Sequence, residues 1–436
     1  MSDLLSGIKV VELASWTYVP SAGAMLADWG ADVIKVEDTK GGDPARYLVS
    51  GGLRPEDSRV NANAVMEIGN HGKRSLAINI KSPEGREIFG KLIGQADVFL
   101  TNWLPAQLER ADLTVDALRK FNQDIIIARG SGQGQRGPDA NRPGFDGTSY
   151  TGRAGVAFAL TPDGVEFPFA QTTAFGDLQG GSTLAGGVAA ALFHRERHRH
   201  APIVDGSLLA QGLWSVAPDI AIADYYGNDG VPKWQAGDAP NPVVNRYKTK
   251  DGRWFQLMFL QADRYWADFC VRIGRPELAD DARFTPLANL TANKTEATAL
   301  LREVFAERDL AEWAEIFQAE TGAWCTLASP REVPNDPQVI ENGYLLTLTD
   351  DKGEEFRTVA APIQFDETPP RPTRSPGHSE HNLPRSGCRD IRYAGDCFGA
   401  EAVPSGKYEC SRVSVTREHS VGWERRYDAA GALGAA

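Results

Sequence analysis

Short β-branched segments alternate with amphipathic segments of helical period through about the first 130 residues of this 436-residue chain. Strands that are joined through helices form a parallel sheet, and the helices cover its faces. The expected strands are IKVVEL, DVIKVE, RSLAINI, ADVFLTNW and DIIIARGSGQG, and the expected helices are PSAGAMLADWG, PEGREIFGKLIG and TVDALRKFN. We therefore expect an α/β fold. Because ligands of such sheets bind beyond the carboxyl ends of the strands, the loops after these strands are the first candidates for a site.

The rest of the chain indicates at least one further domain, since a single hydrophobic core is unusual at this length. Residues 130–175 are rich in glycine, proline and polar residues, and a helix follows them. Residues from about 215 to 245 have the weak periodicity and the prolines of a linker, and the strand pair and helices after them suggest a smaller domain. After about residue 380 the periodicity fails, and three of the five cysteines lie there.

The composition argues against several classes of function. A formal net charge of −12 argues against non-specific binding to nucleic acid or to an anionic membrane. The N-terminus lacks the basic and apolar regions of a signal peptide. The longest small-apolar run, 183–193, is shorter than the ~20 residues of a spanning helix. The five cysteines form no CxxC pair. We therefore expect a reduced, cytoplasmic protein with no membrane span.

Motifs for common cofactors and for hydrolases are missing. Glu37 ends the second strand, where an acid could bind a ribose, but the first turn, ASWTYVPSAG, lacks the glycines of a dinucleotide site. The chain has no P-loop and no GxSxG motif. His194, His198 and His200 alternate with arginines in HRERHRH, which is more typical of a solvated basic helix end than of a metal site. We expect no metal.

One acid, Asp177, stands before a helix in the stretch FGDLQGG. A carboxylate after a glycine and before a helix is most often an N-cap, which accepts the free N–H groups of the helix. The same position would keep the carboxylate ionised and able to attack a carbonyl, and Gly180 and Gly181 would permit close approach of a substrate. The small residues of this helix also favour close packing against a neighbour. The local sequence leaves both roles of Asp177 open and favours the cap.

Three segments, taken in order, resemble the family III CoA-transferases, a group that also contains α-methylacyl-CoA racemases. They are LLSGIKVVELASWTYVPSAGAMLADWGADVIKVEDTKGGDPAR, then NHGKRSLAINIKSPEGREIFGKLIGQADVFLTNWLPAQLERADL, then FGDLQGG. The resemblance covers residues 4 to about 380. It implies a Rossmann-like large domain, a smaller α+β domain and an interlocked homodimer. The implied boundaries are 1–215 for the first part of the large domain, 216–245 for a linker, 246–325 for the small domain, 326–380 for the return to the large domain and 381–436 for an atypical tail.

The resemblance implies that Asp177 is the nucleophile, because it is the aspartate of the family's GD motif. It would attack an acyl-CoA to form a mixed anhydride, and CoA thiolate would convert this into an aspartyl-CoA thioester. A small carboxylic acid would then leave as the new CoA ester. Coenzyme A and acyl-CoA are thus expected as substrates, and no permanently bound cofactor is implied.

The resemblance also implies a set of CoA contacts. The segment NIKSP matches one that binds the adenosine end, and TNWLPAQLER matches a second contact segment. Lys81 and Arg110 would supply positive charge for phosphate. In the first loop a threonine replaces a glutamine of the best-known transferase. The candidate CoA-binding residues are Ile78, Lys81, Asn102, Trp103, Arg110 and Thr17.

Two alternatives remain beside CoA transfer. Racemase relatives carry a histidine before the aspartate of the middle loop, whereas this chain has Phe145 before Asp146. A phenylalanine cannot carry a proton, so a racemase would lack its second acid-base group. An isomerase acting through Asp177 is one alternative, and a non-catalytic acyl-CoA-binding protein is the other. The identity of the acids is not readable from the sequence.

Overall fold

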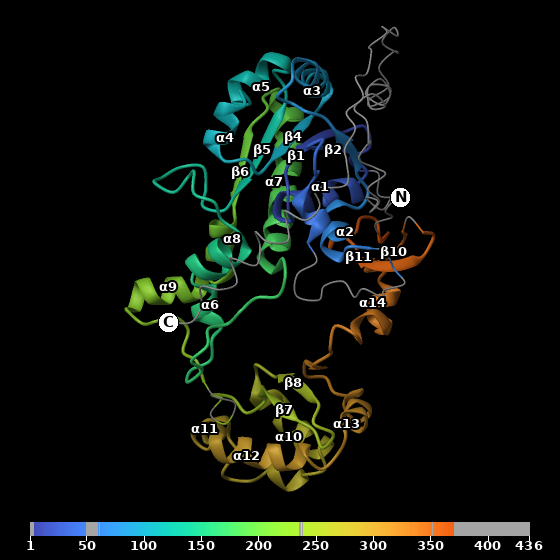
Figure 1. Ribbon diagram of the computed structural model, residues 1–436. Coiled ribbons are helices and arrows are strands. Elements are labelled where there is room, and N and C mark those ends of the chain that lie inside the picture. The colour runs from blue at the N-terminus through green and yellow to red at the C-terminus, as the bar shows by residue number, and fades with distance from the viewer. Residues whose placement is uncertain are drawn as a thin grey trace, which may run out of the picture. The chain divides into compact units, whose positions relative to one another are not determined.

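The computed structural model describes residues 4–48, 60, 62–234, 237, 239–350 and 352–369 (Figure 1). The chain divides into two compact units, Met1–Leu383 and Pro384–Ala436. The second unit, and with it the predicted tail 381–436, lies outside the described residues. All elements reported below belong to the first unit.

A six-stranded sheet of order β3-β2-β1-β4-β5-β6 organises the N-terminal half, and every neighbouring pair of its strands is parallel. The strands are β1 (Lys9–Leu13), β2 (Asp32–Glu37), β3 (Arg74–Ala77), β4 (Val98–Thr101), β5 (Ile126–Ser131) and β6 (Ile203–Ser207). The predicted α/β fold with a parallel sheet is thus confirmed. The chain reverses its direction of winding between β1 and β4, which is where ligands bind in sheets of this order.

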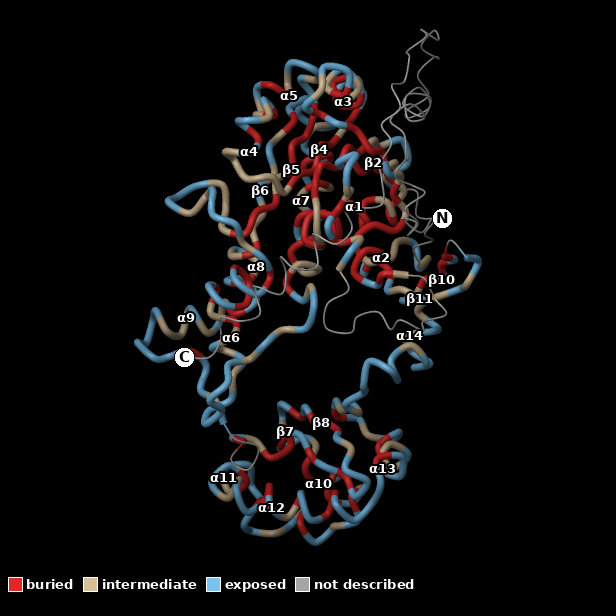
Figure 2. Tube along the Cα trace, in the orientation of Figure 1, coloured by how far each residue is buried: buried red, intermediate tan, exposed pale blue. Residues whose placement is uncertain are grey.

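Helices connect the strands and begin where the sequence offers caps. Pro83 opens α3 behind the capping side chain of Ser82, and Thr114 and Asn63 cap α5 and α2. Helix α1 packs against α7, and α3 packs against α5. Figure 2 shows buried residues concentrated on the strands of this sheet and on the helices beside them. The helices are α1 (Tyr18–Asp28), α2 (Ala64–Asn70), α3 (Pro83–Gln95), α4 (Pro105–Arg110), α5 (Val115–Phe121) and α7 (Phe175–His198).

Several helical segments and the edge strand β6 were not predicted. The glycine-rich stretch 130–175 contains a π-helical segment, η3 (Asp146–Arg153), and the short helix α6 (Val156–Leu160). The predicted linker 216–245 contains α9 (Ala217–Tyr226), which follows α8 (Leu208–Ser215). Helix α9 buries none of its residues, so it has no apolar periodicity that could reveal it. Strand β6 ends the sheet and has no fully buried residue.

A second core lies in a smaller α+β part of the chain. Three antiparallel strands, β7 (Val244–Lys248), β8 (Trp254–Met258) and β9 (Trp324–Thr326), form its sheet. The core between sheet and helices is aromatic and separate from that of the large sheet. The helices are α10 (Ala262–Arg272), α11 (Leu287–Ala292), α12 (Lys294–Phe305) and α13 (Leu310–Phe317). The exact domain boundaries stay predictions.

The last described segment contains α14 (Pro337–Glu341) and the hairpin of β10 (Leu345–Thr349) and β11 (Glu355–Val359). After this hairpin Ala361 joins the core of the large sheet, and its backbone N–H donates to the Asp28 carboxylate across 3.1 Å. No described helix is long and apolar enough to cross a membrane.

Candidate active site

Asp177 lies in the first turn of α7, not at its cap. The helix begins at Phe175, and Ala174 occupies the N-cap position with a left-handed φ of 60°. The Asp177 side chain makes no capping hydrogen bond. The expectation that Asp177 is the N-cap is therefore wrong, because the helix begins three residues earlier than the GD motif suggests.

Asp146, from the π-helical segment η3, serves the helix start instead. Its Oδ2 accepts the Gly176 N–H across 3.0 Å, although the two residues are 30 positions apart. The Tyr150 ring of the same segment packs on the Cα of Gly176, where a Cβ would overlap it. The Tyr150 hydroxyl donates to Gln179 Oε1 on α7 across 3.1 Å. The middle loop thus holds the turn that carries Asp177.

Burial and a neighbouring acid govern the protonation of Asp177. Desolvation of the half-buried carboxyl, with the negative charge of Asp146 adding to it, raises the pKa of Asp177 to about 7. Burial also raises the pKa of Asp146, although the N–H groups of α7 oppose that shift. The expectation of a carboxylate held fully ionised by the helix start is therefore wrong. Asp177 is instead a titratable group near neutral pH, as acid–base and nucleophilic sites often are.

The glycines after Asp177 serve helix packing. A Cβ at Gly180 would lie 2.7 Å from the Tyr18 ring, and one at Gly181 would overlap Ser21 Oγ and lie 2.8 Å from the Tyr18 carbonyl oxygen. Both glycines are buried against α1. The expected close packing of this helix is confirmed. The expectation that Gly180 and Gly181 make room for a substrate is wrong, because α1 fills that space.

Asp177 opens instead into a pocket of about 320 Å³ at the carboxyl ends of β1, β4 and β5. Two loops meet there through one amide: Asn102 Nδ2 donates to Ser15 O across 2.7 Å, and Ser15 N–H donates to Asn102 Oδ1 across 3.2 Å. The pocket lies at the point where the strand order reverses. Its lining residues are Ser15, Trp16, Tyr18, Pro44, Asn102, Trp103, Leu104, Gln107, Gly130, Ser131, Gly132, Pro143, Gly144, Phe145, Asp177 and Leu208.

A second pocket, of about 790 Å³, adjoins the first and shares Trp103 and Gln107 with it. Three cationic residues, Lys81, Arg86 and Arg110, line it. Arg86 donates to the carbonyl oxygens of residues 111 and 112 and pairs with the Asp112 carboxylate at 3.0 Å. Within the described part of the chain, neither the Lys81 ammonium nor the Arg110 guanidinium has a hydrogen-bond or ion-pair partner. These two charges are thus available to an anion.

The other predicted contacts are placed differently. Asn102 and Trp103 line the Asp177 pocket, and Trp103 lines the cationic pocket as well. Ile78 and Thr17 are buried and line neither pocket. Thr17 stands at the start of α1, where its carbonyl oxygen accepts the Ser21 N–H across 2.8 Å. A role of Ile78 or Thr17 in binding CoA stays a prediction.

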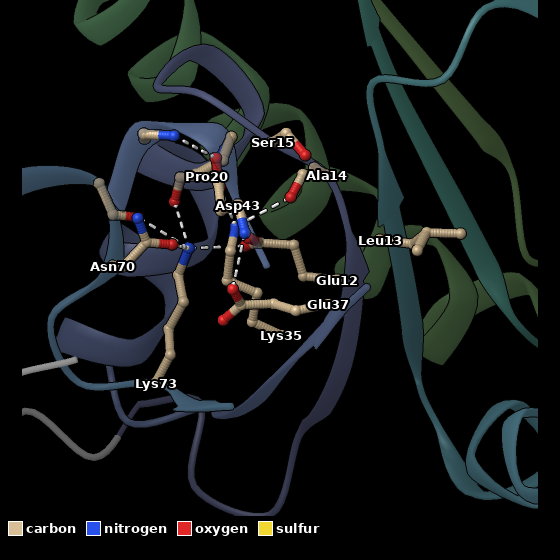
Figure 3. A network of polar contacts seen from close by, with 12 residues as sticks. Glu12, Leu13, Ala14, Ser15, Pro20, Lys35, Glu37, Asp43, Asn70 and Lys73 are labelled. Atoms are coloured by element: carbon tan, nitrogen blue, oxygen red, sulfur yellow. Dashed lines mark hydrogen bonds and ion pairs between the residues drawn. The ribbon is translucent and has the colours of Figure 1, made fainter. Parts of the chain in front are cut away.

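A buried ionic network supports the first loop of the pocket (Figure 3). The Lys35 ammonium lies 2.8 Å from the Asp43 carboxylate and 3.0 Å from that of Glu12, and it donates to Ala14 O across 2.8 Å. Asp43 in turn accepts the Trp16 N–H across 3.0 Å. Burial alone would lower the pKa of Lys35, but the surrounding carboxylates raise it above its ordinary value. Lys35 therefore stays charged and fixes both Ala14 and, through Asp43, Trp16.

Glu37, the residue considered for a ribose contact, belongs to the same network. Its carboxylate accepts the Asp43 N–H across 2.9 Å, the Ser75 hydroxyl across 2.7 Å and the Arg46 guanidinium across 2.6 Å. Although burial opposes ionisation, these donors lower the pKa of Glu37 to about 2. Its acceptor capacity is used within the protein, which agrees with the absence of a dinucleotide motif.

The histidine-rich end of α7 is exposed, as predicted for a solvated helix end. Among the described residues no group of three histidine, cysteine or acidic side chains could hold a metal ion.

Comparison with known proteins gives one consistent result. A family model described as CoA-transferase family III matches residues 5–382. The chain is 32% identical to (R)-2-hydroxy-4-methylpentanoate CoA-transferase of Clostridioides difficile, over 83% of this chain and 89% of that protein. It is 30% identical to cinnamoyl-CoA:phenyllactate CoA-transferase of Clostridium sporogenes, over 88% of this chain and 92% of that protein. A crystal structure of a CAIB/BAIF family protein from Brucella suis is similar with a TM-score of 0.73 and 28% identity, over 87% of this chain and 97% of that one.

Proposed function

The chain belongs to CoA-transferase family III, and we propose that it moves CoA from an acyl-CoA to a carboxylic acid through covalent intermediates on Asp177. One observation carries this proposal. The pocket that contains the titratable Asp177 carboxyl shares two lining residues with the pocket that is lined by Lys81 and Arg110, whose charges have no partner among the described residues. An acyl-CoA has a thioester at one end and phosphates at the other. The two pockets fit these two ends.

The proposed reaction begins when an Asp177 oxygen attacks the thioester carbonyl carbon. The C–S bond breaks, which gives an acyl-aspartyl anhydride and CoA thiolate. The thiolate then attacks the aspartyl carbonyl carbon, and the first acid leaves as its carboxylate from an aspartyl-CoA thioester. The acceptor carboxylate attacks this thioester and releases CoA thiolate. Attack of that thiolate on the acceptor carbonyl yields the new acyl-CoA and restores Asp177. Every step exchanges one anion for another, so the proposed reaction requires no bound cofactor.

The raised pKa of Asp177 suits this role. Only the ionised carboxylate is nucleophilic, and a carboxylate of higher pKa is the stronger nucleophile. With a pKa of about 7, a large fraction of Asp177 is ionised at neutral pH. Partial burial also limits the access of water, which would otherwise hydrolyse the anhydride and the thioester.

Lys81 and Arg110 are proposed to hold the phosphates of CoA. They line the larger pocket, and a flexible ammonium and a planar guanidinium both bind phosphate well. The pantetheine arm would then cross Trp103 and Gln107 to reach Asp177. In this proposal one pocket binds the nucleotide end of CoA and the other binds the acyl end, which accounts for two adjoining pockets.

A homodimer is part of the proposal. Helix α9 buries none of its residues, and a helix of this length is marginal in water without packing. Large apolar side chains on α8 and α9 are exposed: Trp214 by 78%, Tyr225 by 72% and Tyr226 by 73%. A second copy of the chain would cover this surface. Sedimentation of the wild type and of the Trp214→Glu, Tyr225→Glu double variant tests it, and a monomeric wild type would contradict it.

Trapping the covalent intermediate tests the reaction. The protein is incubated with an acyl-CoA, treated with hydroxylamine or borohydride, and mapped by mass spectrometry. An adduct on Asp177 that is absent from Asp177→Ala supports transfer. CoA binding without any adduct would instead indicate a non-catalytic binding protein. Exchange of the α-hydrogen in heavy water would indicate an isomerase, although no histidine lines either pocket.

A further inference from the structure

We propose that the acyl group transferred by this protein is a compact apolar monocarboxylate, aromatic or branched, and that Trp16 and Phe145 form the wall that selects it. This inference rests on the proposed function, because it assigns the smaller pocket to the acyl group that Asp177 attacks. It concerns the part of the substrate that distinguishes one CoA-transferase reaction from another.

Charge is the first observation. Among the described residues that line the smaller pocket, Asp177 is the one charged side chain, and none is lysine, arginine or histidine. A second carboxylate on the acyl group would enter this pocket without a counter-ion and would face the charge of Asp177. Bringing an unpaired charge out of water is costly, so the pocket discriminates against dicarboxylic acyl groups.

Three cations elsewhere around the site pair with acids. Arg46 pairs with Glu37, Arg129 with Asp205 at 2.7 Å, and Arg153 with Asp139 at 2.6 Å. Lys81 and Arg110 line the neighbouring pocket. When CoA phosphates occupy that pocket, these two charges are neutralised as well. A distal carboxylate held within the smaller pocket thus meets no cation among the described residues that line it.

The aromatic wall is the second observation. The rings of Trp16 and Phe145 meet edge to face, with centroids 5.9 Å apart and planes at 87°. Trp16 comes from the loop after β1, and Phe145 comes from the segment before η3. Further apolar lining comes from other residues, among them Trp103, Leu104 and Leu208. Such a surface binds an apolar group by burial and an aromatic ring by the same edge-to-face geometry.

Trp16 is fixed before substrate arrives. Its backbone has a left-handed φ of 68°, which costs a bulky residue of order 1 kcal/mol and persists only where the surroundings impose it. The Asp43 carboxylate, itself held by Lys35, accepts the Trp16 N–H across 3.0 Å. A wall that is ordered in advance loses little entropy when the acyl group binds.

The volume sets an upper limit to the acyl group. At about 320 Å³ the pocket is at the small end of ligand sites, which span roughly 300–1,000 Å³. A phenyl or branched alkyl group fits this space, whereas a long fatty chain would have to leave it. Small size and apolar character are therefore separate requirements on the acyl group, and each can be tested with its own acyl-CoA.

The test compares kcat/KM for acyl-CoA donors with acetate as common acceptor. The donors are 3-phenylpropionyl-CoA and 4-methylpentanoyl-CoA, against succinyl-CoA, glutaryl-CoA and palmitoyl-CoA. We expect the first two to exceed the dicarboxylic and long-chain donors by about 100-fold or more. Equal values for succinyl-CoA, with an Asp177 adduct from each donor, would overturn this inference and leave the proposed function intact. No adduct from any donor would overturn both.

Variants at the wall sharpen the test. Phe145→Ala should lower the ratio of kcat/KM for 3-phenylpropionyl-CoA to kcat/KM for acetyl-CoA by about 10-fold, an effect of ~1.4 kcal/mol. Phe145→Arg places a cation at the pocket and should raise the succinyl-CoA to 3-phenylpropionyl-CoA ratio by at least ~10-fold. Phe167→Arg, at an exposed phenylalanine outside the lining, is the matched control and should not change the ratio. A ratio that is the same in both arginine variants would overturn the role of Phe145.

Discussion

The Asp146 carboxylate accepts the backbone N–H of Gly176 across 3.0 Å and so caps the helix that carries the neighbouring Asp177. The two acids are coupled, because the charge of Asp146 adds to burial in raising the pKa of Asp177 to about 7. One residue therefore both holds the proposed nucleophile in place and adds to the effect of burial on the pKa of that nucleophile.

Replacing Asp146 by asparagine should separate these two effects. The amide oxygen can still accept the Gly176 N–H, but the negative charge is gone, so the pKa of Asp177 should fall. The acid limb of the kcat/KM against pH profile, expected near pH 7 in the wild type, should move to lower pH. Asp139→Asn removes an acid of the same loop that pairs with Arg153 and should leave the limb in place. An unmoved limb in Asp146→Asn would show that the charge of Asp146 does not govern Asp177.

The ionised form of Asp177 should also lower the free energy of unfolding at neutral pH. Its pKa rises from the ordinary value of 3.8 to about 7 on folding, so the folded protein binds the proton more tightly than the unfolded chain. Stability conferred by the protonated form is complete below about pH 4 and is lost as the pH rises to about 7. Asp177→Asn should therefore gain free energy of unfolding over the wild type between these pH values, and the gain should then level off. Urea denaturation of both proteins at pH 4.5, 6 and 8 measures this gain. A difference in the free energy of unfolding that is the same at all three pH values would contradict the raised pKa.

The glycines of α7 offer a matched pair for stability. Gly181→Ala would push a methyl group into Ser21 and the Tyr18 backbone, and overpacking of this kind costs about 1–3 kcal/mol. Gly186 lies in the same helix, and a Cβ added there would meet no atom within 4 Å. Gly186→Ala should therefore stabilise the protein by about 0.5–1 kcal/mol. Thermal or urea denaturation of both variants measures the contrast. Equal effects would show that α1 and α7 do not pack as closely as described.

Lys81 and Arg110, whose charges have no partner among the described residues, should bind only the nucleotide end of CoA. Arg110→Ala and Lys81→Ala should each raise KM for acyl-CoA by about 10-fold or more, since a hydrogen bond to a charged group contributes about 1.5–3 kcal/mol. The same variants should leave kcat/KM for an acyl-pantetheine, which lacks the nucleotide, close to the wild-type value. Lys91→Ala, at an exposed lysine paired with Glu87, is the control. A parallel loss on both substrates would place these residues elsewhere in the mechanism.

Much of the large sheet could be predicted because its signals are local. Strands β1, β2, β4 and β5 are runs of mostly buried residues, and α3 begins with a serine cap and a proline. Lys81, Asn102, Trp103 and Arg110 follow strands whose carboxyl ends meet at one edge, so their approach to the two pockets follows from topology. In these segments the pattern of the sequence and the packing of the structure agree.

The rest depends on contacts between distant segments. Nothing in FGDLQGG shows that Asp146 takes the capping role, because the carboxylate arrives from another loop. Gly180 and Gly181 could equally face a substrate or a helix, and the Tyr18 ring decides between these. Helix α9 has no buried face, and the edge strand β6 has no fully buried residue, so neither has the periodicity that reveals an element.

The packing of α7 on α1 has a consequence for how such a protein can change. The helix that carries the proposed nucleophile packs on α1 with no room for an extra methyl group at Gly181, whereas Trp16 and Phe145 belong to loops. Substitutions in these loops can alter which acid is accepted while the reacting carboxyl keeps its place. The proposed acid preference can thus vary at these two side chains without disturbing the close packing of α7 on α1.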